Sequence, residues 1–146
     1  MKKNYFKLMA ACGASAMVMS CASTKPGSEP MKLNGKWDVI AVSGLNGPIQ
    51  AENKPFIAFG ENGQVSGNAG CNRMMGIYVA DATKQTLSLD QMGSTRMMCR
   101  DMATEDALLA ALGKVKAYRA EADDQLVLVD DKGTSLVTLK KAQTDK

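Results

Sequence analysis

The chain has 146 residues, a formal net charge of +3 and no histidine, and this length leaves room for a single domain. Lys2, Lys3 and Lys7 account for the whole charge excess, so the chain from Cys21 onward is formally neutral. A neutral domain without a basic run lacks the electrostatic surface of a nucleic-acid-binding protein, and that class is excluded.

Residues 1–20 have the organisation of a secretory signal peptide. A lysine-rich start precedes an apolar run, residues 8–19, that is too short to span a bilayer as a helix. The leader ends in Val18-Met19-Ser20-Cys21, which resembles the lipobox of bacterial lipoproteins. The resemblance implies cleavage before Cys21 and lipidation of that residue, which would hold the protein on a membrane. The alternative is an ordinary cleaved signal followed by an incidental cysteine.

Residue 22 is alanine rather than aspartate. By resemblance to the sorted lipoproteins of Gram-negative envelopes, alanine there favours the outer membrane, so we expect a lipid-anchored envelope protein in that membrane. Residues 21–32 are polar and rich in Ser, Pro and Gly, which predicts a flexible tether. Residues 33–141 are expected to form the folded domain, and residues 142–146 a disordered tail.

Short alternating runs bounded by Gly, Asn and Asp dominate the rest of the chain and predict strands. In the first run, Trp37, Val39 and Ala41 are expected on one face, with Ile40 and Val42 on the other. Asp-rich segments after Ala122 and after Val129 predict hairpin turns. The expected strands are residues 36–42, 55–59, 64–68, 76–80, 86–90, 115–120, 125–129 and 135–139.

Residues 101–112 break this pattern and predict a helix. Asp101 is expected to cap it, Glu105 and Asp106 suit its positive N-terminal end, and Gly113 is expected to end it in a left-handed conformation. Three leucines give the helix an apolar face that must be buried on the sheet. The predicted fold class is therefore mainly β (α+β), a curved antiparallel sheet or partial barrel of about eight strands packed on one α-helix.

Cys71 and Cys99 are the two cysteines of the folded region. In an exported domain, two such thiols most simply form one disulfide, which would contribute about 3–4 kcal/mol on the chain-entropy model. Zinc is the competing explanation, but the chain has neither histidine nor a second close-spaced cysteine pair. We therefore expect no metal site and no cofactor.

Two segments around these cysteines resemble the signature segments of the META domain family, which includes lipoproteins similar to the heat-shock protein HslJ. They are Gly67-Asn68-Ala69-Gly70-Cys71-Asn72-Arg73 and Ser94-Thr95-Arg96-Met97-Met98-Cys99. The resemblance extends from about Leu33 to Leu139 and departs from the family pattern at Met74-Met75 and at Met98. It implies a curved antiparallel sheet that cradles a helix, and a role in stress response and envelope integrity without established catalytic residues.

Four residues of these segments form the candidate binding surface: Asn72, Arg73, Thr95 and Arg96. A disulfide would bring both arginines to one surface, where guanidinium groups can make bidentate contacts to carboxylate or phosphate. The alternative is that the arginines pair with Asp101 or with other local acids.

No catalytic residue is assigned. The glycine-rich stretch lacks the terminal Gly-Lys-Ser/Thr of a phosphate-binding loop, and a cysteine nucleophile would have no histidine as its base. The leading interpretation is a monomeric, non-enzymatic envelope lipoprotein whose domain binds an envelope protein or an apolar ligand.

Two alternatives of other classes stay open. Methionines crowd around the cysteines (Met74, Met75, Met92, Met97, Met98 and Met102). Thioethers select Cu(I), which would make the domain a metal-handling module, although methionine also fills irregular cores. A hydrolase could use Asp123-Asp124 or Asp130-Asp131 as acid and base, although these positions also suit turns.

Overall fold

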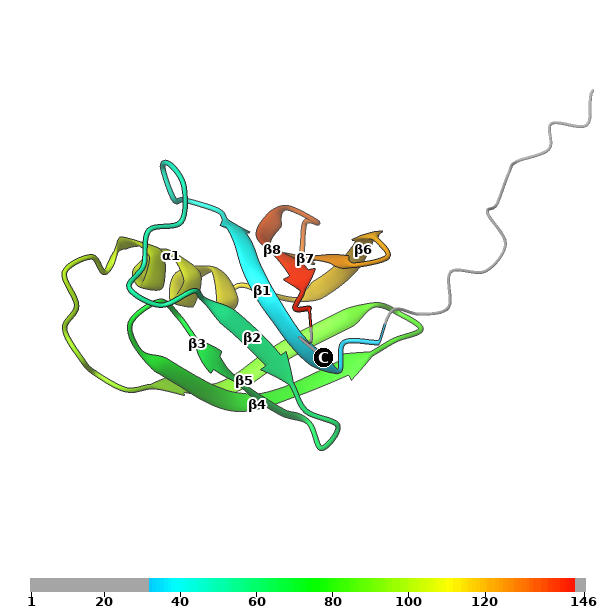
Figure 1. Ribbon diagram of the computed structural model, residues 1–146. Helices are drawn as coiled ribbons and strands as arrows, with labels where there is room; N and C mark the ends of the chain where they lie inside the picture. Colours follow the sequence, from blue (N-terminus) through cyan, green and yellow to red (C-terminus); the bar gives the residue numbers. More distant parts are fainter. Residues whose placement is uncertain (1–31, 144–146) are drawn as a thin grey trace, which may run out of the picture.

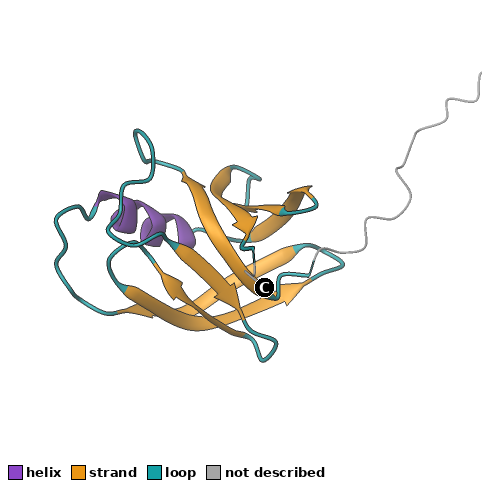
Figure 2. Ribbon diagram, viewed as in Figure 1, coloured by secondary structure: helices purple, strands orange, loops and turns teal. Residues whose placement is uncertain are grey.

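The protein, described here as a computed structural model over residues 32–143, is a closed barrel of antiparallel strands with one helix (Figures 1 and 2). The predicted signal peptide, Cys21, nearly all of the tether and residues 144–146 lie outside the described residues. The prediction of a mainly β fold with one helix is confirmed. The elements are β1 (Gly35–Val42), β2 (Phe56–Phe59), β3 (Gln64–Asn68), β4 (Arg73–Asp81), β5 (Thr86–Ser94), α1 (Ala103–Leu112), β6 (Ala117–Ala122), β7 (Gln125–Val129) and β8 (Ser135–Lys141).

Each strand pairs with the next one in sequence, and β8 returns to pair with β1. Most of this order follows from short polar turns, because a tight turn joins antiparallel neighbours. The exceptions are β1 to β2, which a longer connection joins, and β5 to β6, between which α1 lies. The turn between β7 and β8 shows the local chemistry, since the Asp130 carboxylate accepts backbone hydrogen bonds from Lys132 and Thr134, and Gly133 has a φ of +80°. Within residues 32–143, no helix is long and apolar enough to cross a membrane.

The interior of the barrel is filled by side chains. Trp37 is fully buried at the centre of the core, and its indole N–H donates to the carbonyl of Leu33 at 2.6 Å. Eight strands enclose a space that side chains can fill, and the alternating apolar positions of the strands supply them. The largest fully buried core residues besides Trp37 are Ile57, Met74, Leu87, Leu108, Leu126, Leu128 and Leu139.

One predicted face assignment on β1 is wrong. Ala41 is exposed and Val42 is buried, the reverse of the expected alternation. The register between β1 and β8 shifts between Val39 and Ala41. A bulge inserts one extra residue into a strand, so every side chain beyond it changes face.

Helix α1 packs against β1 and β8 at one end of the barrel (Figure 2). It begins at Ala103, two residues later than predicted, and its N-cap residue is Met102, which makes no side-chain cap hydrogen bond. Asp101 lies one residue before the cap, and its Oδ1 accepts the Ala103 N–H at 2.9 Å. The expected left-handed conformation of Gly113 is wrong, since its φ is −64° and its ψ is −15°. The Gly113 N–H still bonds to Leu109 and the next N–H to Ala111, so the chain winds onward toward β6 instead of reversing.

Both ends of the described chain lie at the opposite end of the barrel from α1 (Figure 1). Trp37 pairs with Lys141, and the Ala142 N–H donates to the carbonyl of Lys36. The barrel therefore has a helix-capped end and a terminus-bearing end.

The phenols of Tyr78 and Tyr118 are expected to ionise only above their ordinary pKa of 10. Burial raises the pKa of both groups, and the negative charges of Glu61 and Asp81 raise them further. A raised pKa means that the folded state favours the neutral phenol. The contribution of these phenols to the free energy of unfolding is therefore complete below pH 10, and it is lost as the pH rises through their pKa values in the folded protein. The third tyrosine, Tyr5, lies in the leader.

Absorbance at 295 nm, measured on the mature chain while it stays folded, follows these two groups alone. Tyr118→Phe leaves a single titration that belongs to Tyr78. A phenol that ionises at or below pH 10 in the folded protein would contradict the expectation.

Candidate functional site

A disulfide links Cys71 to Cys99, with an S–S distance of 2.04 Å and a Cα–Cα distance of 6.0 Å. The predicted pairing is confirmed. Cys71 lies in the turn between β3 and β4, and Cys99 lies in the segment between β5 and α1. The bond therefore fastens two connections at the helix-capped end of the barrel.

A buried carboxylate lies beside this disulfide. Glu105, in the first turn of α1, is 3% exposed, and its Oε2 accepts the backbone N–H groups of Cys71 at 3.1 Å and Asn72 at 2.7 Å. Its Oε1 accepts the side-chain amide of Asn72 at 2.6 Å. A buried carboxylate is tolerable only when donors satisfy it, and three N–H donors near the positive end of a helix do so here.

Asn72 is a correction to the candidate binding surface, because it is 2% exposed and lies beneath that surface. Its Oδ1 accepts the backbone N–H of Met97 at 2.7 Å and the hydroxyl of Thr95 at 2.8 Å. Its Nδ2 also donates to the carbonyl of Met97 at 3.0 Å. One amide side chain thus bonds to both polar groups of the Met97 backbone, and it holds the loop after β5 against the turn before β4.

The first turn of α1 also holds the long connection between β1 and β2. The Thr104 hydroxyl donates to the carbonyl of Gln50 at 2.7 Å and accepts the Gln50 N–H at 3.3 Å. Within residues 32–143, no buried side-chain nitrogen or oxygen lacks a partner. Glu105 and Asn72 form one hydrogen-bonded network, and Thr104, next to Glu105 in α1, bonds separately to Gln50. We call these three buried residues the polar hub.

The glycine-rich stretch has a packing role. A Cβ at Gly67 would lie 2.1 Å from the carbonyl oxygen of Phe56 and 2.8 Å from the Met74 methyl. Gly70 has a φ of +123°, a conformation that L side chains rarely adopt. Gly67 therefore lets β3 lie close against β2, and Gly70 lets the chain turn toward Cys71.

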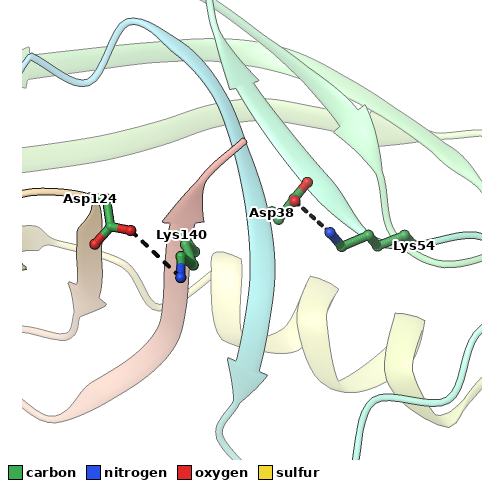
Figure 3. Close-up of polar contacts among 4 residues, drawn as sticks. All are labelled: Asp38, Lys54, Asp124 and Lys140. Carbon is green, nitrogen blue, oxygen red and sulfur yellow. Dashed lines mark hydrogen bonds and ion pairs between the residues drawn. The ribbon is translucent and has the colours of Figure 1, made fainter. Parts of the chain in front are cut away.

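The remaining three candidate residues, Arg73, Thr95 and Arg96, are exposed above the hub. Arg73 and Thr95 are joined by two hydrogen bonds, from the Arg73 N–H to the Thr95 hydroxyl and from the Thr95 N–H to the Arg73 carbonyl. The alternative, in which the arginines pair with Asp101 or with other local acids, is not observed among the described residues. The ion pairs within residues 32–143 are Lys54–Asp38, Lys84–Asp81 and Lys140–Asp124, two of which are drawn in Figure 3.

Apart from the single residue Ile40 on β1, the large apolar side chains that are exposed among the described residues lie in two places. Met75, Ile77 and Val79 follow one another on the outer side of β4, 62%, 40% and 67% exposed, and we call them the β4 face. A groove of about 730 Å³ runs beside Met75 and Ile77, across the outer surface of β1 to β4. Met97 and Met98, 55% and 90% exposed, form the tip of the second place, residues 96–100, which we call the methionine loop.

Several residues of the copper-binding and hydrolase alternatives take part in packing, turns or ion pairs. Met74 is 1% exposed and packs in the core. No group of three or more Cys, Asp or Glu side chains suited to a metal occurs in residues 32–143. Asp124 pairs with Lys140 at 3.6 Å (Figure 3), and the backbone hydrogen bonds to Asp130 lower the pKa of that carboxyl.

Glu105 was not singled out as a site residue from the sequence. The signal was present, because Glu105, Leu108 and Leu112 are spaced by three and four residues and therefore share one helical face. The structure buries all three. An acid on the apolar face of a helix indicates a buried donor set.

The META domain family model matches residues 29–143 of the chain. No curated protein matches the chain. One solved NMR structure is 26% identical, with a TM-score of 0.58, over 77% of this chain and 93% of its own. An NMR structure of a protein from Burkholderia xenovorans is 22% identical, with a TM-score of 0.58, over 94% of this chain and 100% of its own.

A crystal structure of a DUF4847 family protein from Bacteroides vulgatus is 16% identical, with a TM-score of 0.52, over 82% of this chain and 100% of its own. Because the Burkholderia and Bacteroides proteins are less than 25% identical to this chain, their similarity concerns the fold alone.

Proposed function

Because the chain belongs to the META domain family, we propose that it is a non-enzymatic lipoprotein of the cell envelope whose barrel binds a protein or an apolar ligand during envelope stress. The observation that carries the binding role is the β4 face beside its groove. The barrel interior is filled, so a ligand must bind on the outside. Contiguous exposed apolar residues on a soluble domain mark interaction sites.

The site on β4 is tested with exposed residues, so that the fold is preserved. Met75→Lys/Val79→Lys places two charges on the β4 face, and Ile40→Lys places one on β1, where Ile40 is 43% exposed. In cells that lack the protein, Ile40→Lys is expected to restore heat tolerance as well as the unmodified protein does, whereas the β4 variant fails. Equal rescue by both variants would reject the β4 face as the binding site.

Anchoring of the domain depends on Cys21, which the lipobox resemblance marks for lipid. Cys21→Ser is expected to abolish incorporation of labelled fatty acid and the cleavage before residue 21, because no thiol is left to modify. Fatty-acid labelling, the mass of the mature protein and density-gradient fractionation of the envelope measure this outcome. The leader cysteine provides the matched control, since Cys12→Ser should leave lipidation and outer-membrane location intact. Labelling that survives in Cys21→Ser would refute the anchor.

A further inference from the structure

The methionine loop, residues 96–100, exposes apolar side chains from a rigid backbone. Met98 is 90% exposed and Met97 is 55% exposed. Both polar backbone groups of Met97 are bonded to the Asn72 side chain, and Cys99 is held by the disulfide. The backbone that carries these side chains is therefore already fixed, and an occupant would not have to rearrange it.

Cations surround this apolar tip. Arg96 and Arg100 flank the two methionines, and the hydrogen bonds between Thr95 and Arg73 bring a third arginine to the base of the loop. None of the three takes part in an ion pair among the described residues. An apolar tip flanked by arginines matches the border of an anionic bilayer, with acyl chains below and phosphates above.

We propose that the methionine loop docks the barrel on an anionic phospholipid bilayer, with Met97 and Met98 inserted and the arginines at the phosphates. The β4 face is less suited to an anionic bilayer, because the strand neighbours of Ile77 are polar. They are Gln64 on β3 and Asp90 on β5, and the carboxylate of Asp90 would repel anionic headgroups. The loop is therefore a second surface, separate from the one to which the binding function is assigned.

The chain is long enough for the anchor and the loop to reach one bilayer. The loop lies at the helix-capped end, and β1 begins at the opposite end (Figure 1). The segment from Cys21 to Asn34 can span roughly 45–50 Å when fully extended, whereas β1 is roughly 26 Å long. The proposed lipid on Cys21 decides only where in the cell the loop meets a bilayer. Binding of the loop itself is therefore tested with protein that carries no lipid.

The test measures binding of the full mature chain, carrying Cys21→Ser and no lipid, to sedimenting vesicles. The vesicles are phosphatidylcholine alone or phosphatidylcholine with phosphatidylglycerol at about 7:3. We expect binding to the anionic vesicles only, because the arginines need a negative surface. Met97→Ser/Met98→Ser should weaken the partition about tenfold, since less apolar surface is buried. Arg96→Gln/Arg100→Gln should weaken it about fivefold for each arginine.

Two controls make the outcome specific. Lys114→Gln/Lys116→Gln removes two exposed positive charges elsewhere and should leave the partition within about twofold. Met75→Ser/Val79→Ser alters the β4 face and should also leave it unchanged. The proposal is overturned if the unmodified chain ignores anionic vesicles, if the methionine variant binds as well as the parent, or if the lysine control loses as much as the arginine variant. These results concern the vesicles alone, so they are independent of heat tolerance and of the binding function on β4.

Discussion

Replacing Glu105 with alanine is expected to lower the free energy of unfolding by about 3–5 kcal/mol. The substitution removes a buried acceptor and strands three donors, the N–H groups of Cys71 and Asn72 and the amide of Asn72. Each unsatisfied buried donor costs about 1–3 kcal/mol. Because the chain has one tryptophan and that residue is fully buried, urea unfolding followed by Trp37 fluorescence measures the change.

Exchanging the carboxylate of Glu105 and the amide of Asn72 tests the hydrogen bond between them separately from the packing around it. Asn72→Asp would place two carboxylates at the contact where Oε1 of Glu105 now accepts an amide at 2.6 Å. Glu105→Gln would instead place two amide donors there. The double variant Glu105→Gln/Asn72→Asp restores one donor and one acceptor, so it should be more stable than the sum of the single changes by about 1–2 kcal/mol.

The matched control is the neighbouring acid on the same helical turn. Asp106 is exposed, and Asp106→Ala should change stability by no more than about 0.5 kcal/mol. If Glu105→Ala costs no more than Asp106→Ala, or if the double variant shows no coupling, the hub does not contribute as its geometry implies.

Reducing the Cys71–Cys99 disulfide is expected to cost about 3–4 kcal/mol of unfolding free energy. The bond closes a loop between residues that are 28 positions apart, and its main effect is to restrict the unfolded chain. The urea midpoint should therefore fall when the oxidised protein is treated with a thiol reductant. The dependence on urea should become steeper, because the unlinked chain exposes more surface when it unfolds.

Cys71→Ala/Cys99→Ala supplies the control for this experiment. Its urea midpoint should lie near that of the reduced protein and should not respond to reductant. If peptide mapping shows free thiols while the midpoint is unchanged, the disulfide does not stabilise the barrel.

The strand pattern and the turns could be predicted because their causes are local. Alternating apolar residues between Asp- and Gly-rich turns specify neighbouring antiparallel strands, and the turn at Asp130 forms from its own backbone and side chain. The bulge between Val39 and Ala41 was not predictable, because it depends on the partner strand β8. Closure of the sheet is likewise decided by strands from opposite ends of the chain.

The candidate site was predicted only in part. The pairing of Cys71 with Cys99 followed from their number and their expected compartment, and the structure confirms it. The burial of Asn72 and Glu105 depends on hydrogen bonds between residues 33 positions apart, and sequence spacing does not show these. Polar residues near a predicted surface were therefore assigned to that surface, although one of them lies beneath it.

The position of the chain ends has a mechanical consequence. If the lipid holds the protein at the terminus-bearing end while a partner or a membrane grips the helix-capped end, tension enters the barrel at Gly35 and runs along β1. That strand is bonded on both sides, to β2 and to β8, by hydrogen bonds that lie across the pulling direction. The hydrogen bonds to both neighbouring strands then bear the load together in shear, and they do not open one after another. A barrel tethered in this way should therefore resist forced extension.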